Sequence, residues 1–139
     1  MRSTKPILLV EDDSVDAMTV KRALKELNVA NELVHCLNGL EALEYLRNQG
    51  GKKPCLILLD LNMPKMNGID FLKTIKADDN LKNISVVILT TSGNEKDIID
   101  SFNLNIAGYI VKPVDYEKFV EAVKTIDQYW TLSELPEED

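Results

Sequence analysis

The stretch Cys55-Leu56-Ile57-Leu58-Leu59 is followed directly by Asp60. A continuous apolar run of this length, without polar alternation, predicts a β-strand that is covered on both faces. Such strands are typical of parallel sheets, in which helices pack above and below the sheet. The run therefore indicates the centre of an α/β fold, with a carboxylate placed where a buried strand ends.

Four other segments also predict strands. Glu32-Leu33-Val34-His35-Cys36 has a mixed composition that favours a position near an edge of the sheet. The remaining three are continuous apolar runs of strand length: Ile7-Leu8-Leu9-Val10, Val86-Val87-Ile88-Leu89 and Gly108-Tyr109-Ile110-Val111.

Between these strands, apolar residues recur at helical spacing: from about residue 14, over 40–46, 69–75 and 98–102, and from about residue 115 to residue 130. Strands that alternate with helices form βαβ units, whose right-handed crossovers place helices on both faces of one sheet. We therefore expect an α/β fold with a five-stranded parallel, doubly wound sheet. Residues 1–130 form its single domain, and residues 131–139 form an acidic tail.

Composition narrows the class of protein. The chain has 139 residues, 45% hydrophobic and 28% charged, which is typical of one soluble domain. No apolar stretch reaches membrane-span length and residues 1–6 lack a signal-peptide core, so we expect a cytoplasmic protein with no membrane association. The net charge of −7 disfavours nucleic acid as a partner. Cys36 and Cys55 form no CxxC pair and are expected to be buried free thiols.

The residues that end the predicted strands are the candidate functional residues. They are Glu11-Asp12-Asp13, Asp60, Thr90-Thr91-Ser92 and Lys112-Pro113. Ligands bind such sheets outside the carboxyl ends of the strands. Converging carboxylates repel one another unless a cation lies among them, and oxygen ligands without His or Cys favour Mg²⁺. A hydroxyl and an ammonium opposite could hold phosphate oxygens, so the pattern predicts phosphoryl chemistry.

Each of these residues also has an ordinary structural explanation. Asp13 or Ser14 is expected to be the N-cap of the first helix. Asp60 could simply begin a turn, Lys112 could be a solvated loop lysine, and Thr90 could be a hydroxyl at a strand end. The functional interpretation rests on the coincidence of all four at strand ends.

The chain resembles the receiver domains of response regulators, including the chemotaxis regulators, over about residues 5–128. The resemblance is carried by Leu9-Val10-Glu11-Asp12-Asp13, Leu58-Leu59-Asp60-Leu61-Asn62-Met63-Pro64-Lys65-Met66-Asn67-Gly68, Ile88-Leu89-Thr90-Thr91-Ser92 and Tyr109-Ile110-Val111-Lys112-Pro113. It implies a flavodoxin-like receiver fold with the strand order 2-1-3-4-5.

The resemblance also implies a metal site and an acceptor. Asp60 would accept a phosphoryl group from a phosphohistidine of a sensor histidine kinase or phosphotransfer protein. Asp12 and Glu11 would hold Mg²⁺ together with Asp60 and the backbone carbonyl of Asn62.

Three further roles are implied for residues on the other side of the site. Lys112 would pair with Asp60, and its bond to Pro113 is a candidate cis peptide. Thr90 and Tyr109 would switch on phosphorylation and change the surface of the fourth helix, fifth strand and fifth helix. Such a protein is not an enzyme in the ordinary sense, since it catalyses only its own phosphorylation and slow dephosphorylation, and another protein would read its state.

The sequence departs from common receivers in the long loop over residues 48–54, in Thr91 and in the extension after residue 130. With Tyr129-Trp130, these features resemble the small single-domain receivers paired with bacterial phytochromes. A phytochrome is therefore a candidate kinase partner. After residue 130 the chain is too short for a DNA-binding helix-turn-helix, so we expect no DNA-binding output domain.

Alternative functions remain open at this stage. A haloacid-dehalogenase-like phosphatase would need a second Asp two residues after Asp60, where Asn62 stands. A pseudo-receiver scaffold usually lacks the acids or the lysine, which are present here. A flavodoxin-like electron carrier would need a Ser/Thr/Gly-rich phosphate loop. His35 is expected to be an ordinary strand histidine.

The predicted fifth helix carries more aromatic side chains than packing against the sheet can cover. Tyr116, Phe119, Tyr129 and Trp130 favour a homodimer, made or strengthened by phosphorylation, through the surface of the fourth helix, fifth strand and fifth helix. The alternative is that Trp130 folds back as the last core residue.

Overall fold

Five parallel strands alternate with five helices in the computed structural model, which describes residues 5–48, 53–63, 66–91, 93–111 and 115–132, and the side chains of the last helix as far as Thr125. The elements are β1 (Ile7–Val10), α1 (Ser14–Glu26), β2 (Leu33–Cys36), α2 (Gly39–Asn48), β3 (Leu56–Leu59), α3 (Gly68–Lys76), β4 (Ser85–Thr90), α4 (Glu95–Asn103), β5 (Gly108–Val111) and α5 (Tyr116–Leu132).

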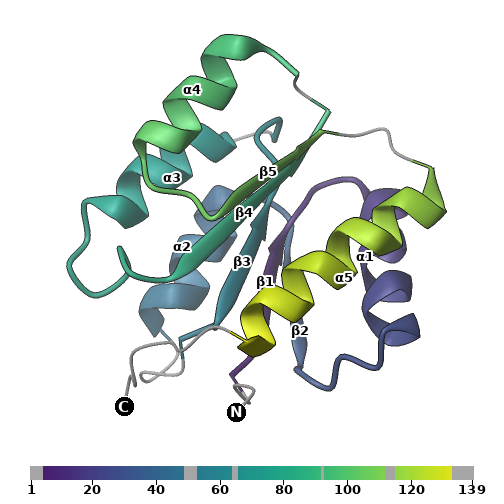
Figure 1. Cartoon of the computed structure of the whole chain (residues 1–139). Helices are drawn as coiled ribbons and strands as arrows, with labels where there is room; N and C mark the ends of the chain where they lie inside the picture. Colours follow the sequence, from purple (N-terminus) through teal and green to yellow (C-terminus); the bar gives the residue numbers. More distant parts are fainter. Residues whose placement is uncertain (1–4, 49–52, 64–65, 92, 112–114, 133–139) are drawn as a thin grey trace.

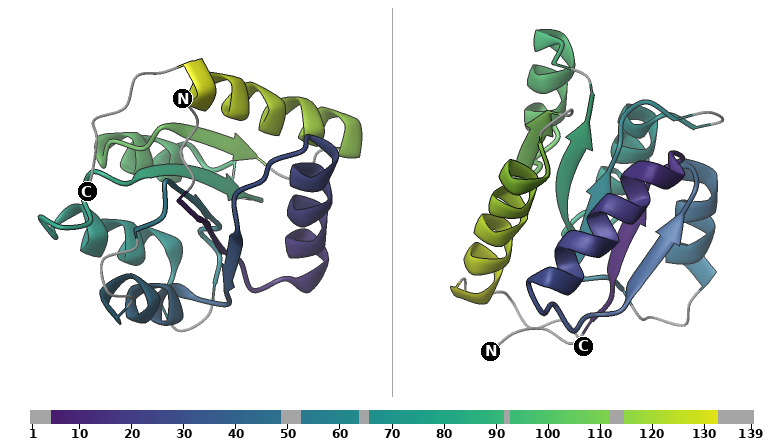
Figure 2. Two further views of the ribbon diagram at one scale, coloured as in Figure 1. Left: turned by 90° about the horizontal axis from the view of Figure 1, so that it is seen from below. Right: turned by 90° about the vertical axis from the view of Figure 1, so that its right-hand side faces the viewer.

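The sheet has the order β2-β1-β3-β4-β5, with every neighbouring pair parallel. Helices α1 and α5 cover one face, and α2, α3 and α4 cover the other (Figures 1 and 2). The doubly wound fold and its strand order are therefore confirmed. β2 is an edge strand, as expected, and three of its four residues are only half-buried.

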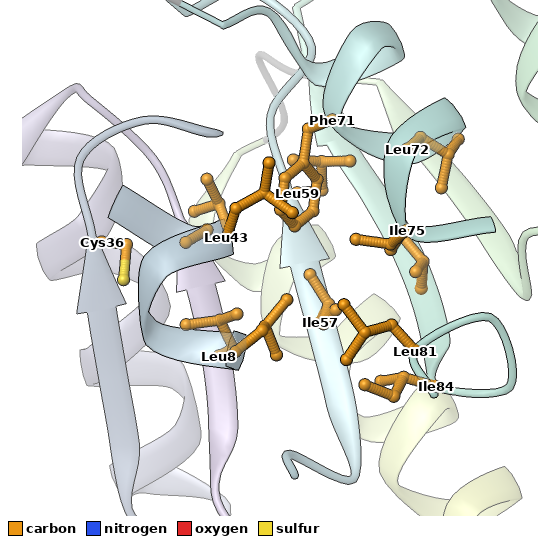
Figure 3. Packing of buried hydrophobic residues seen from close by; sticks show 14 of the residues in the cluster. Leu8, Cys36, Leu43, Ile57, Leu59, Phe71, Leu72, Ile75, Leu81 and Ile84 are labelled. Carbon is orange, nitrogen blue, oxygen red and sulfur yellow. The ribbon is translucent and has the colours of Figure 1, made fainter. Parts of the chain in front are cut away.

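Successive residues of the central strands alternate between two cores. In β1, Leu8 and Val10 join the cluster on the α2–α3–α4 side, whereas Ile7 and Leu9 join the cluster under α1 and α5. Figure 3 shows the first cluster, in which Ile57 and Leu59 of β3 lie against the apolar side chains of α2 and α3. Because both faces are covered, β1 and β3 are apolar at every position and β4 from Val86 to Leu89, which explains the unbroken runs in the sequence.

Side chains at the helix starts set where the helices begin. Asp13 is the N-cap of α1, and its carboxylate accepts hydrogen bonds from the backbone N–H groups of Val15 (2.8 Å) and Asp16 (3.0 Å). Asn67 and Asn94 cap α3 and α4 in the same way. Asp115 precedes α5 and accepts from the N–H of Lys118 at 2.9 Å, so this helix begins one residue later than expected.

Cys36 and Cys55 are free thiols, as expected, but Cys55 is only half-buried, at the start of the run that leads into β3. Cys36 is buried at the end of β2, and burial raises the pKa of its thiol to about 11. Within the described ranges, no helix combines the length and the apolar character that a membrane span would need.

Candidate functional site

Three carboxylates meet at the carboxyl edge of the sheet. Oxygens of Glu11, Asp12 and Asp60 all lie within 4.8 Å of one another. The register explains this convergence: Val10 of β1 pairs with Leu59 of β3, so the next residue of each strand arrives at the same point of the edge. The sequence-predicted acidic site is therefore assembled by the pairing of β1 with β3.

The three carboxylates differ in exposure. Glu11 and Asp60 are 1% and 7% exposed, whereas Asp12 faces solvent. Carboxylates held this close, two of them out of water, gain stability from a cation placed among them. The donor set consists of oxygen atoms, with a water-accessible side at Asp12, and this chemistry suits a hard divalent ion that keeps part of its hydration shell.

Backbone hydrogen bonds hold the acidic residues in place. The N–H of Asp60 donates to the carbonyl of Val10, and the N–H of Glu11 donates to the carbonyl of Cys36, both at 3.0 Å. His35 contributes a further contact, 2.7 Å from its Nε2 to the carbonyl oxygen of Glu11. The histidine therefore acts in this structure as a strand residue that supports the acidic loop.

Gly68 sets the path of the chain after Asp60. Its N–H donates to the carbonyl of Leu61 at 2.9 Å. A Cβ atom at this position would lie 2.5 Å from the backbone oxygen of Asp60 and from the Cα of Leu61. Only glycine permits this close approach of α3 to the loop that follows Asp60. Gly68 stood in the family motif of the sequence, but its packing role needed the structure.

The β4 side of the site consists of hydroxyl and amide groups. Thr90 ends β4 and is fully buried, whereas Thr91 is exposed. The Nδ2 of Asn62 lies 3.4 Å from the Oγ1 of Thr90 and 3.3 Å from the Oγ1 of Thr91, and donates to both. The sequence placed the backbone carbonyl of Asn62 at the metal and the side chains of Asn62 and Ser92 beside the path of a hydrolytic water, but it did not predict this side-chain bridge between the β3 and β4 loops.

An open cavity of about 580 Å³ lies over the acidic residues. It extends from the acidic edge to the β4 loop and is large enough for a metal ion and a phosphoryl group. Its lining residues come from the start of α1 and from the ends of β3 and β4: Asp12, Asp13, Ser14, Val15, Asp16, Asp60, Asn62 and Thr91.

Other expected site residues lie apart from this cavity or outside the described ranges. Tyr109 is half-buried in β5, paired with Ile88, and packs against the core on the α4 side. Lys112, Pro113 and Ser92 lie outside the described residues, so the lysine pairing and the cis peptide stay predictions.

The described part of the aromatic cluster on α5 packs within the chain. Phe119 is 4% exposed and belongs to the core under α1 and α5. Arg22 lies over the ring of Tyr116 at 4.1 Å, and the tyrosine hydroxyl donates to Glu26 at 3.4 Å. The side chains of Tyr129 and Trp130 are outside the described part. The α4–β5 region instead exposes Ile99, Phe102 and Val111.

These features define a class of protein. The family model for the response regulator receiver domain matches residues 7–124 of the sequence, and the chain belongs to that family. It is a receiver-domain response regulator of two-component signalling.

Individual relatives place the chain within the family. It is 41% identical to the response regulator Rcp1 of Synechocystis sp. over 130 residues, covering 91% of this chain and 88% of Rcp1. The phosphorylated cyanobacterial phytochrome response regulator RcpA superposes with a TM-score of 0.88 at 40% identity, covering 97% of this chain and 100% of RcpA. The crystal structure of the Mn²⁺-bound form of Rcp1 superposes with a TM-score of 0.85 at 40% identity, covering 96% of this chain and 99% of the Rcp1 chain. The chain is therefore close to phytochrome-associated receivers, as the sequence indicated.

Proposed function

We propose that this protein is a cytoplasmic, Mg²⁺-dependent phosphorylation switch that accepts a phosphoryl group on Asp60. The observation that carries the proposal is the convergence of Glu11, Asp12 and Asp60 within 4.8 Å, with Asp60 lining the cavity. A buried acceptor carboxylate next to two further carboxylates can attack a phosphoryl group only where a cation offsets the accumulating negative charge.

Asp12, Glu11, Asp60 and the backbone carbonyl of Asn62 would hold the Mg²⁺. The metal would supply positive charge to the phosphoryl oxygens as the group is transferred. Rcp1, which is 40% identical to this chain, has a crystal structure in a Mn²⁺-bound form, and the acidic cluster here is consistent with a site for such an ion.

Asp60 would attack the phosphorus of a phosphohistidine in line, and the P–N bond would break as the P–O bond forms. Thr90 and Lys112 would then bind the remaining phosphoryl oxygens. Thr90 would leave Asn62 to do so, and Tyr109 would turn further inward against the α4 side. The surface of α4, β5 and α5 would change with them, which gives a partner or a second copy a state to read.

The phosphodonor would be a sensor histidine kinase or a phosphotransfer protein. The relationship to RcpA, a phytochrome response regulator, favours a phytochrome-linked kinase. A phosphatase of the haloacid-dehalogenase type is disfavoured because Asn62 offers no acidic proton two residues beyond Asp60. A pseudo-receiver scaffold has the same fold and is the alternative that the next experiment excludes or supports.

Asp60→Asn tests the proposal directly. The parent protein should incorporate phosphate from radiolabelled acetyl phosphate or phosphoramidate in the presence of Mg²⁺, and the variant should not. Asp79→Asn, the same change at a surface residue that pairs with Lys82, should label like the parent and serves as the matched control. A parent that stays unlabelled, or a labelled Asp60→Asn variant, would contradict the assignment.

A further inference from the structure

Thr91 has no role in the function proposed above, yet it shares the cavity with the acceptor. Its hydroxyl oxygen accepts a hydrogen bond from the Nδ2 of Asn62 at 3.3 Å. Both residues line the cavity that also contains Asp60. The Asn62 backbone N–H donates to Oδ1 of Asp60 at 3.2 Å, so the asparagine is held to the acceptor residue at one end and to the β4 loop at the other.

The two threonines that hold the amide differ in what phosphorylation would do to them. Thr90 is fully buried, and in the proposed function it leaves Asn62 to bind the phosphoryl group. Thr91 is exposed, lines the cavity and has no such second task. Of the two threonines, Thr91 is therefore the one that can still hold the Asn62 amide in this orientation when Asp60 is phosphorylated.

This orientation decides which end of the amide faces the cavity. Because Nδ2 is directed at the threonines, Oδ1 lies at the opposite end of the planar group. The Oδ1 atom accepts no hydrogen bond from the described part of the chain. Asn62 lines the same cavity as Asp60, so this neutral oxygen is left to accept a hydrogen bond from a water molecule there.

We propose that Thr91 is a positioning residue that fixes the Asn62 carbonyl oxygen as the acceptor for the water that hydrolyses the aspartyl phosphate, which rests on the proposed phosphorylation of Asp60. The water oxygen attacks the phosphorus in line, and the bond between phosphorus and the Asp60 oxygen breaks. The electron pair of that bond returns to the carboxylate. The water loses a proton to solvent, and inorganic phosphate leaves. Asn62 orients the water and takes no proton.

The test is the first-order decay of the aspartyl phosphate in Mg²⁺ after the phosphodonor is removed. Thr91→Val keeps the shape and removes the hydroxyl, and should slow decay about two- to tenfold, the range that one neutral hydrogen bond supplies. Thr91→Ser retains the hydroxyl and should decay at nearly the parent rate. Asn62→Ala should slow decay as well, and adding Thr91→Val to it should change nothing further.

The controls separate this inference from the function on which it rests. Mg²⁺ affinity, measured by titration calorimetry, should be equal in the parent and in Thr91→Val. Decay of Thr91→Val at the parent rate or faster overturns the inference, as does an additional slowing in the Asn62→Ala background or a loss of metal affinity that accounts for the effect. Each of those results leaves phosphate incorporation intact, whereas a parent protein that never incorporates phosphate refutes the proposed function itself.

Discussion

Asp12 is the exposed member of the acidic cluster, so its substitution removes a carboxylate from the proposed metal site without opening a cavity in the core. We expect Asp12→Ala to abolish stimulation of phosphorylation by Mg²⁺, because charge on the transferring group is then poorly offset. Initial rates of labelling from phosphoramidate with Mg²⁺ and with excess EDTA measure this. Asp79→Ala should keep the full stimulation, and equal rates with and without metal in the parent would contradict the metal assignment.

Gly68 shows how one added atom can disturb the loop that follows Asp60. In Gly68→Ala the new Cβ meets backbone atoms of Asp60 and Leu61 at 2.5 Å, and the loop must move. Overpacking of this kind costs about 1–3 kcal/mol of unfolding free energy, and labelling of Asp60 should fall as well. Gly93→Ala is the matched control, since among the described residues its Cβ would meet only a Val111 methyl, at an ordinary 3.7 Å. If urea unfolding gave equal free energies of unfolding for the two variants, the loop would accommodate the added Cβ without cost, and this prediction would be wrong.

At the scale of elements, β2 carries a titratable group in the core. Burial raises the pKa of Cys36 to about 11 from 9.0, so the thiol stays protonated in the folded protein where the unfolded chain would ionise it. The stabilising contribution is complete below pH 9 and is lost as the pH rises to about 11. The loss is on the order of 2 kcal/mol.

Urea unfolding at pH 9 and at pH 11 measures this loss of free energy. Cys36→Ala should flatten the decline, whereas Cys55→Ala, at a half-buried cysteine outside the strands, should leave it in place. A decline that is identical in the parent and in Cys36→Ala would show that other groups cause the alkaline loss.

The elements themselves were largely predictable from the sequence. Unbroken apolar runs indicated β1, β3, β4 and β5, and the mixed pattern of β2 indicated its edge position. Burial of both faces explains the runs of β1, β3 and β4, whereas β5 is also an edge strand, so the expectation that it is covered on both faces was wrong. The acidic site followed from parallel strands that end at one edge. The Asn62 bridge to Thr90 and Thr91 could not be predicted, because it depends on side-chain rotamers in two loops distant in sequence. The intrachain packing of Tyr116 on Arg22 was missed for the same reason, since α1 and α5 meet only in the fold.

At the scale of the whole molecule, exposed residues of α4 and β5, and not the aromatic residues at the start of α5, favour the expected homodimer. Tyr116 and Phe119 have partners within the chain, whereas Ile99 and Phe102 on α4 and Val111 on β5 are 40–50% exposed. An exposed apolar group on the surface expected to switch favours association there. At about 100 μM, sedimentation equilibrium should show more dimer with beryllofluoride than without it, since this is well above a micromolar dissociation constant.

Phe102→Ser should weaken this dimer, whereas Met18→Ser, at an exposed methionine on α1, should not. A protein that stays monomeric with and without beryllofluoride, or a dimer that Met18→Ser weakens as much as Phe102→Ser, would contradict the placement of the interface.

The central claim is that Asp60 carries the phosphoryl group, and chemical trapping tests it most directly. Sodium borohydride reduces an aspartyl phosphate to homoserine, which peptide mass spectrometry locates in the sequence. After phosphorylation in Mg²⁺, homoserine should appear at position 60 and at no other Asp, and omission of the phosphodonor should abolish it. Homoserine at Asp12 or Asp13, or stable phosphate on His35, would contradict the account.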